Sequence, residues 1–262
     1  MTAAPPQTEH NGSSAPVLEL RGLAYAYPDG HQALYGVELT VTRGERVAVL
    51  GPNGAGKTTL VLHLNGILVP GLGSVRIDGM QVGAETIREV RRRVGVVFQD
   101  PDDQLFMPSV RDDVAFGPAN LGLRGGELDA RVDEALRQVG MGDYADRPPH
   151  HLSFGQRRRV AVATVLAMRP SILVLDEPSS NLDPASRREL AEILRRLDVT
   201  VLMVTHDLPY ALELCERSVI LDGGTIVADG PTPRVLGDAD LMAAHRLELP
   251  YGFDPHLADR TR

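Results

Sequence analysis

Short apolar runs alternate with longer amphipathic stretches along most of this chain. Runs rich in Val, Ile and Leu predict β-strands at residues 17–20, 23–27, 34–41, 46–50, 74–77, 94–98, 172–175 and 200–204, followed by a hairpin of 218–222 and 224–228. The stretches between them predict helices at residues 57–68, 110–116, 127–139, 154–168, 185–197 and 209–216. Because helices separate successive strands at both ends of the chain, we expect an α/β fold with a mostly parallel sheet and flanking helices.

The character of the sequence changes at three places. Residues 1–16 are rich in Ala, Pro, Ser and Thr, and we predict a disordered tail there. Residues 17–235 carry the strand and helix pattern of one domain, interrupted by a mostly helical insertion over about residues 100–158. Residues 236–262 are patterned more loosely and form a C-terminal extension.

Composition narrows the classes of function. Apolar residues make up 43% of the 262 residues, but aromatic residues only 4%, which suits an aliphatic core around a buried parallel sheet. The net charge of −8 argues against nucleic acid as a partner. We find no apolar stretch near the ~18 residues of a membrane-spanning helix and no signal-peptide pattern. The single Cys215 fits a reducing compartment and is interpreted as a small core residue.

A glycine-rich loop directly follows the apolar strand at residues 46–50. It consists of Gly51, Pro52, Asn53, Gly54, Ala55, Gly56, Lys57, Thr58 and Thr59, and matches G-x-x-x-x-G-K-[ST]. Such a loop aims backbone N–H groups at phosphate oxygens, and the helix behind it adds the positive end of its dipole. We predict that Lys57 binds the β- and γ-phosphates of ATP, that Thr58 coordinates Mg²⁺ and that Thr59 reaches the α-phosphate.

Polar side chains at the ends of three other strands fit the same chemistry. Asp176 ends an apolar strand and is a candidate ligand of Mg²⁺, while the next residue, Glu177, is a candidate base for the attacking water. His206 is predicted to reach the γ-phosphate, and Gln99 to bind Mg²⁺ or the water. Taken alone, each of these residues could simply be an ordinary polar side chain at a strand end. Because they occur together in a chain that also carries a phosphate loop, they favour a catalytic role.

A second candidate phosphate site lies ahead of the Asp176 strand, in Leu152–Gln156. Ser153, Gly155 and a helix N-terminus together form an anion site. This site belongs to the helical insertion, so it does not easily serve the γ-phosphate of its own chain. We therefore expect a head-to-tail dimer in which Ser153 and Gly155 complete the partner's site. The alternative is a serine that only caps a helix.

The order of these motifs resembles the nucleotide-binding subunits of ABC transporters. Six elements carry the resemblance over residues 17–231: Gly51–Thr59 (Walker A), Gln99 (Q-loop), Leu152–Gln156 (signature), Ile172–Glu177 (Walker B), Ser180–Asp183 (D-loop) and His206 (H-loop). The resemblance implies a P-loop NTPase fold with a RecA-like lobe, a helical subdomain and an antiparallel β subdomain, and a closed dimer with two ATP molecules. It also implies that Tyr27 stacks on adenine, the alternative being a half-buried strand aromatic.

Further segments resemble the energy-coupling factor importers, which take up vitamins or transition-metal ions. These are Tyr27–Gly30, Val96–Phe106 and Ala115–Pro118. Within that group, His63–Leu68 and His151–Gln156 look closest to the cobalt- and nickel-type ATPases. The resemblance implies a membrane coupling subunit and a substrate-binding membrane subunit as partners, and a peripheral place on the cytoplasmic face of the membrane. Leu105, Phe106 and Met107 are candidate apolar contacts to the coupling subunit, the alternative for each being simple packing at the start of a helix.

One motif departs from the commoner pattern. Ser180 and Asn181 stand in the D-loop where a small pair such as Ala-Gly is more usual, while Asp183 is retained. All catalytic elements are present in one chain, which favours a homodimer, although a heterodimer with a similar ATPase stays open. An ABC exporter subunit is the nearest alternative function, and the stretch from Asp100 to Phe106 argues against it.

Overall fold

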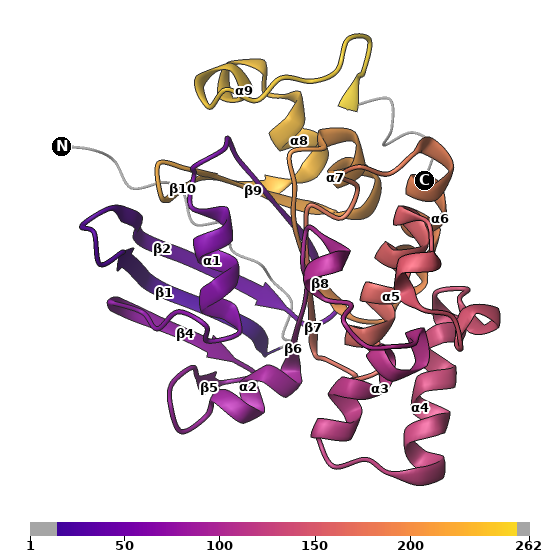
Figure 1. Cartoon of the computed structure of the whole chain (residues 1–262). Coiled ribbons are helices and arrows are strands. Elements are labelled where there is room, and N and C mark those ends of the chain that lie inside the picture. The colour runs from indigo at the N-terminus through magenta and orange to yellow at the C-terminus, as the bar shows by residue number, and fades with distance from the viewer. Residues whose placement is uncertain (1–14, 256–262) are drawn as a thin grey trace.

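We describe residues 15–255 of a computed structural model, in which two sheets and several helices build the fold (Figure 1). All but the last two residues of the predicted tail over 1–16 lie outside the described residues. The strands are β1 Pro16–Ala26, β2 Gln32–Thr42, β3 Arg46–Leu50, β4 Leu72–Ile77, β5 Met80–Gln81, β6 Val94–Val97, β7 Ile172–Asp176, β8 Thr200–Val204, β9 Arg217–Asp222 and β10 Thr225–Pro231. The α-helices are α1 Lys57–Leu64, α2 Ile87–Arg93, α3 Val110–Asn120, α4 Gly125–Gln138, α5 Phe154–Leu166, α6 Pro184–Arg196, α7 Leu208–Leu214, α8 Thr232–Gly237 and α9 Ala239–Ala244.

The central sheet has the order β10-β9-β3-β8-β7-β6, and every pair from β9 to β6 is parallel. A second sheet, β2-β1-β4-β5, is antiparallel throughout. The predicted α/β class, with a mostly parallel sheet and an antiparallel N-terminal sheet, is therefore confirmed.

Side-chain alternation explains why the central strands are apolar at every position. In β3, Val47 and Val49 pack into a core shared with the antiparallel sheet and α1, whereas Ala48 and Leu50 pack into a core shared with α3, α5 and α6. Successive side chains of a strand point to opposite faces, so a strand covered on both faces reads as a continuous apolar run. Figure 1 shows the antiparallel sheet on one side of the central sheet and the helices α3, α4 and α5 on the other.

The helical lobe lies between β6 and β7 in the sequence. It contains short 3-10 turns at Pro101–Asp103, Gly142–Tyr144 and Pro149–His151 in addition to α3, α4 and the start of α5. Helices α3 and α4 pack against each other and against α5. Because α5 runs from this lobe into the core of the central sheet, it connects the two parts of the fold.

Three details differ from the sequence-based expectation. The two predicted strands at residues 17–27 are one strand, β1, whose pairing shifts register between Leu20 and Leu23 around Gly22 at φ 59°. Helix α1 ends at Leu64 rather than at residue 68, since Gly66 follows with φ 64°. The short, arginine-rich α2 and the C-terminal α8 and α9 were not predicted.

The described part of the predicted C-terminal extension, residues 236–255, packs onto the domain. His245, just after α9, lies 2.8 Å from the Asp222 carboxylate at the end of β9. Among residues 15–255, the helices are all too short or too polar to cross a lipid bilayer.

Candidate functional site

The carboxyl ends of four neighbouring parallel strands meet at one edge of the central sheet. The P-loop follows β3, His206 follows β8, Asp176 ends β7 and Gln99 follows β6. Backbone hydrogen bonds continue between the strand ends at this edge. The Thr205 N–H donates to the Val49 carbonyl at 3.2 Å, and the Glu177 N–H donates to the Val204 carbonyl at 2.8 Å. In open α/β sheets this edge is where ligands bind. The pairing of the strands therefore brings together residues that lie up to 155 positions apart in the sequence, from Gly51 to His206.

The P-loop, Gly51–Thr59, turns tightly over this edge. Gly56 has φ 102°, and a Cβ there would lie 2.7 Å from the Ala33 carbonyl oxygen, so only glycine fits. Lys57 begins α1 and is 9% exposed. Its Nζ donates to the carbonyl oxygens of Gly51 at 2.7 Å and Pro52 at 2.9 Å, which places the charge inside the curve of the loop. Thr58 is exposed on the same turn.

Charges of both signs face one another beside the P-loop. Burial lowers the pKa of Lys57, while Glu177 and Asp176 raise it. Burial also raises the pKa of Asp176, and the neighbouring Glu177 raises it further, while Lys57 and Arg158 act in the opposite direction. Two adjacent carboxylates in a partly buried place favour a bound cation. Thr58, Gln99 and Asp176 supply the hydroxyl, amide and carboxylate oxygens that suit Mg²⁺, so the predicted metal site fits the residues present.

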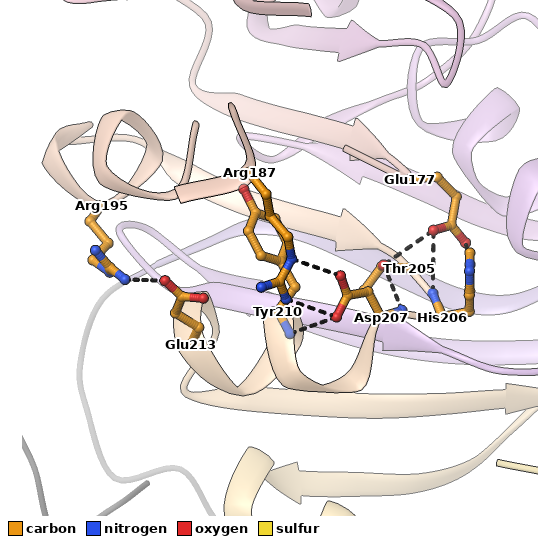
Figure 2. Close-up of polar contacts among 8 residues, drawn as sticks. All are labelled: Glu177, Arg187, Arg195, Thr205, His206, Asp207, Tyr210 and Glu213. Carbon is orange, nitrogen blue, oxygen red and sulfur yellow. Dashed lines mark hydrogen bonds and ion pairs between the residues drawn. The ribbon is translucent and has the colours of Figure 1, made fainter. Parts of the chain in front are cut away.

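Glu177 is held by two residues that directly follow β8 (Figure 2). The residue has φ 46°, a left-handed backbone conformation that is uncommon for residues other than glycine. One carboxylate oxygen lies 2.8 Å from His206 Nδ1, and the other accepts a hydrogen bond from the Thr205 hydroxyl at 3.1 Å. Glu177 is buried, whereas the His206 side chain is largely exposed. The second nitrogen of the imidazole is thus available to a group above the sheet edge.

The same network continues into the helix that follows the D-loop (Figure 2). Asp207 donates its N–H to the Thr205 hydroxyl at 3.0 Å and caps α7 by accepting from the Tyr210 N–H. Arg187, on α6, donates to both oxygens of Asp207 at 3.1 and 3.0 Å and covers the Tyr210 ring. Sequence reasoning missed Thr205, Asp207 and Arg187. Only Asp207 carries a sequence signal, since an Asp before a helix is a typical N-cap.

The signature residues lie on the helical lobe, at the start of α5. Ser153 caps the helix: its hydroxyl accepts from the Gln156 N–H at 3.2 Å, and the Gln156 side chain accepts from the Ser153 N–H at 2.9 Å. The Ser153 side chain is exposed, while Gly155 is buried against Ser186 of α6. The capping role is therefore real, and it leaves the serine hydroxyl and the helix N-terminus on the surface.

The D-loop backbone explains the unusual Asn181. Its φ is 62°, a left-handed conformation that glycine adopts freely and asparagine tolerates better than most residues. Asp183 then caps α6, accepting from the N–H groups of Ala185 at 2.9 Å and Ser186 at 3.1 Å. Asn181 in place of the commoner glycine therefore preserves both the left-handed turn of the D-loop and the Asp183 cap of α6.

Tyr27 and Gln99 flank the P-loop. The Tyr27 hydroxyl is hydrogen-bonded to Thr59 Oγ1 at 3.0 Å, and the Tyr25 ring meets the Tyr27 ring edge-on at 5.1 Å. The Tyr27 ring is therefore fixed beside the first turn of α1. The Gln99 side chain is exposed, and its backbone carbonyl is held by Arg158.

Known proteins share these motifs in this order. The ABC transporter family model matches residues 34–180, more than half of the chain. The chain belongs to the ABC transporter family of ATPases. A putative ABC transporter ATP-binding protein of Streptomyces avermitilis is 74% identical over 242 residues, which cover 92% of each chain. An energy-coupling factor transporter ATP-binding protein, EcfA, of Methanothermobacter thermautotrophicus is 50% identical over 251 residues, 94% of this chain and 80% of that one.

A solved structure of the family has the same fold. The structure of cbiO1 from Clostridium perfringens, part of the ABC transporter complex cbiONQ, superimposes with a TM-score of 0.79. It is 38% identical in sequence and the match covers 93% of this chain and 99% of that one. The resemblance to energy-coupling factor ATPases that Val96–Phe106 suggested is thus confirmed at the level of sequence and fold.

The Thr205 hydroxyl provides a first test of the site of this ABC ATPase. Thr205→Val preserves the side-chain volume but removes the hydrogen bond that orients Glu177. We expect kcat for ATP hydrolysis to fall about tenfold to a hundredfold, with little change in KM, because the geometry of the reacting groups is disturbed. The free energy of unfolding should fall by about 1–3 kcal/mol, since the Asp207 N–H loses its acceptor.

The matched control is Thr200→Val at the other end of β8. The Thr200 hydroxyl is also buried and accepts a backbone N–H, that of Gly44, at 2.9 Å. This variant should lose stability to a similar extent in chemical denaturation and keep its kcat. Equal values of kcat in the two variants, measured by phosphate release, would contradict a role for Thr205 in the site.

Proposed function

We propose that this chain is the ATP-hydrolysing subunit of an energy-coupling factor importer for a micronutrient, and that ATP-driven closure of a dimer powers the import. The observation that carries the proposal is the Glu177–His206 pair beside the P-loop, with a signature helix exposed on a separate lobe. The names of the relatives support the transporter type. A cobalt or nickel ion, or a vitamin, is the substrate class we infer from the resemblance.

Each residue at the sheet edge receives a role in this proposal. The N–H groups of Gly51–Gly56 and the Lys57 ammonium bind the phosphates, and Thr59 reaches the α-phosphate beside an adenine stacked on Tyr27. Thr58, Asp176 and Gln99 hold Mg²⁺, which when bound neutralises phosphate charge. Glu177 accepts the proton of the attacking water, and His206 holds Glu177 and reaches the γ-phosphate.

The signature residues act in trans. Ser153 and Gly155 start a helix on the helical lobe, and the Ser153 side chain is exposed at that helix start. A helix N-terminus that is exposed in one subunit suits the γ-phosphate held by another. We favour a homodimer, because one chain carries both halves of the site.

A membrane partner is supported by an apolar surface next to the Q-loop. Phe106 is 64% exposed and Phe116 is 45% exposed, and their rings meet edge-on at 5.0 Å. Asp113 fixes the segment by accepting from the N–H groups of Phe106 and Met107, both at 3.0 Å. Leu105 was a predicted contact, but it is buried in the core. We infer that Phe106 and Phe116 receive an amphipathic helix of a membrane coupling subunit, with a substrate-binding membrane subunit beyond it, at the cytoplasmic face.

Glu177→Gln tests the hydrolytic role. Glutamine fills the same space but does not accept the proton, so we expect the hydrolysis rate to fall about a hundredfold or more. ATP binding should persist, and a dimer should accumulate with ATP and Mg²⁺ in size-exclusion chromatography with light scattering. Glu192→Gln, an exposed residue of α6, is the control and should hydrolyse ATP like the wild type. An unchanged rate in Glu177→Gln would contradict the role.

The apolar surface is tested by Phe106→Ser combined with Phe116→Ser. The chain carries an affinity tag and is recovered from detergent-solubilised membranes of the cells that make it. The wild type should retain proteins with membrane-spanning helices, and the double variant should lose them while its basal ATPase rate stays the same. Tyr251→Ser, at a fully exposed residue of the C-terminal extension, is the control and should retain them. Equal retention by all three chains would contradict the proposed docking surface.

A further inference from the structure

The segment that carries Gln99 is fastened to the signature helix α5 at several points. This segment, residues 98–104, leaves β6 and leads into the helical lobe, and we refer to it as the Q-loop segment. Besides hydrogen bonds within the segment, its backbone and side chains form hydrogen bonds and an ion pair with one helix, α5. The contacts come from Arg157, Arg158 and the backbone one turn further along.

Arg158 makes the central contact. Its side chain is fully buried, at 0% exposure. The guanidinium donates to the Phe98 carbonyl oxygen at 2.7 Å and also to the Gln99 carbonyl oxygen. It lies 5.4 Å from the centre of the Phe154 ring, within cation–π range. Arg158 thus binds the two peptide groups on either side of the Gln99 Cα, from which the Gln99 side chain projects.

Gln104 and Arg157 add further contacts on either side. The Gln104 side chain accepts from the Phe98 N–H at 3.2 Å and donates to the Ala161 carbonyl at 2.8 Å and to Thr164 Oγ1 at 2.7 Å. Arg157 forms an ion pair with Asp102 at 2.9 Å. Because the Asp102 side of that pair is exposed, the pair adds little stability, whereas the buried contacts fix the geometry.

A buried guanidinium at this place is costly. Burial lowers the pKa of Arg158, opposed by Asp100 and Asp176. Within residues 15–255, its Nε finds no hydrogen-bond acceptor. An apolar side chain would fill the same space without removing a charge from water. The contact that an apolar residue lacks is the pair of hydrogen bonds to Phe98 and Gln99.

The same helix carries the signature at its start. Ser153 caps α5 and Arg158 follows five residues later, a rise of roughly 7 Å along the helix. One helix therefore carries the exposed Ser153 side chain at its start and holds the Gln99 backbone carbonyl through Arg158. A displacement of the helix start moves both.

We propose that Arg158 is a positioning residue that couples the signature of this chain to its own Gln99, so that engagement of Ser153 by the partner's nucleotide sets Gln99 in the neighbouring site. This inference rests on the proposed function, in which Gln99 binds Mg²⁺ and Ser153 binds ATP in trans. Arg158 touches no substrate. It acts through Gln99. An experiment can therefore distinguish an effect of Arg158 on Gln99 from an effect on the stability of the fold.

The test compares full-length Arg158→Met, Arg158→Lys and Gln99→Ala with the Arg158→Met/Gln99→Ala double variant. In Arg158→Met we expect kcat to fall about tenfold to a hundredfold with little change in KM for ATP, since Gln99 loses its position. The Mg²⁺ concentration for half-maximal activity should rise, and Arg158→Lys should recover part of the loss. The double variant should be no slower than Gln99→Ala alone, because residues that act together are non-additive.

A second readout needs no hydrolysis. Hydrogen exchange of the Q-loop segment should slow in the wild type when ATP and Mg²⁺ are added, and should not respond in Arg158→Met. The matched control is Arg131→Met, since Arg131 also donates to a backbone carbonyl, that of Ala167 at 3.2 Å, but lies away from the Q-loop segment. Its Mg²⁺ dependence and exchange should be those of the wild type.

The outcomes distinguish this inference from the proposed function. Additive losses in the double variant, or an Arg158→Met protein with the Mg²⁺ dependence and exchange response of Arg131→Met, would overturn the coupling role. If instead the wild type fails to hydrolyse ATP, or Glu177→Gln hydrolyses it normally, the proposed function fails and the coupling role fails with it.

Discussion

The parallel pairing of β3, β8, β7 and β6 is the constraint on which the rest of the structure depends. It places four strand ends at one edge of the sheet, although the residues that follow them are far apart in the sequence. The pairing requires strands that are apolar on both faces, with one core toward the antiparallel sheet and one toward the helices. The polar residues begin where this packing ends. A carboxylate pair, an imidazole and an amide therefore gather at the same edge of the sheet as the P-loop.

Hydrogen bonds, more than proximity, organise the groups at that edge. Glu177 is hydrogen-bonded to Thr205 and His206, which follow β8. The Thr205 hydroxyl also accepts from the Asp207 N–H, and the Asp207 carboxylate accepts from Arg187 on α6. On the other side, Arg158 and Gln104 connect the Q-loop segment to α5. The two helices whose starts carry the D-loop and the signature are thus each tied to one residue of the hydrolysis site. This arrangement suits an ATPase whose two sites communicate through the surfaces where subunits meet.

Much of this could be predicted from the sequence because local chemistry specifies it. The P-loop glycines, the apolar strand before Asp176 and the serine cap of α5 each depend on a few adjacent residues, and the structure places them as expected. The contacts of Thr205 and Arg158 depend on elements distant in sequence, so nothing near them signals a role. Leu105 was predicted as a candidate contact to a coupling subunit, with simple packing as the alternative, and it is buried in the core beside the helical lobe. The bulge at Gly22 depends on sheet pairing, which a periodicity does not show.

The central claim is that the P-loop of one chain meets the signature of another. Asn53 and Ser153 are both exposed, and the only native cysteine, Cys215, is buried, so introduced thiols are selectively reactive. Chains with Asn53→Cys and chains with Ser153→Cys are mixed and treated with a short thiol-specific cross-linker. The account predicts a covalent product of twice the chain mass in the mixture when ATP is present, and none from either variant alone. ATP binding by the mixture without that product, or equal product from each variant alone, would contradict it.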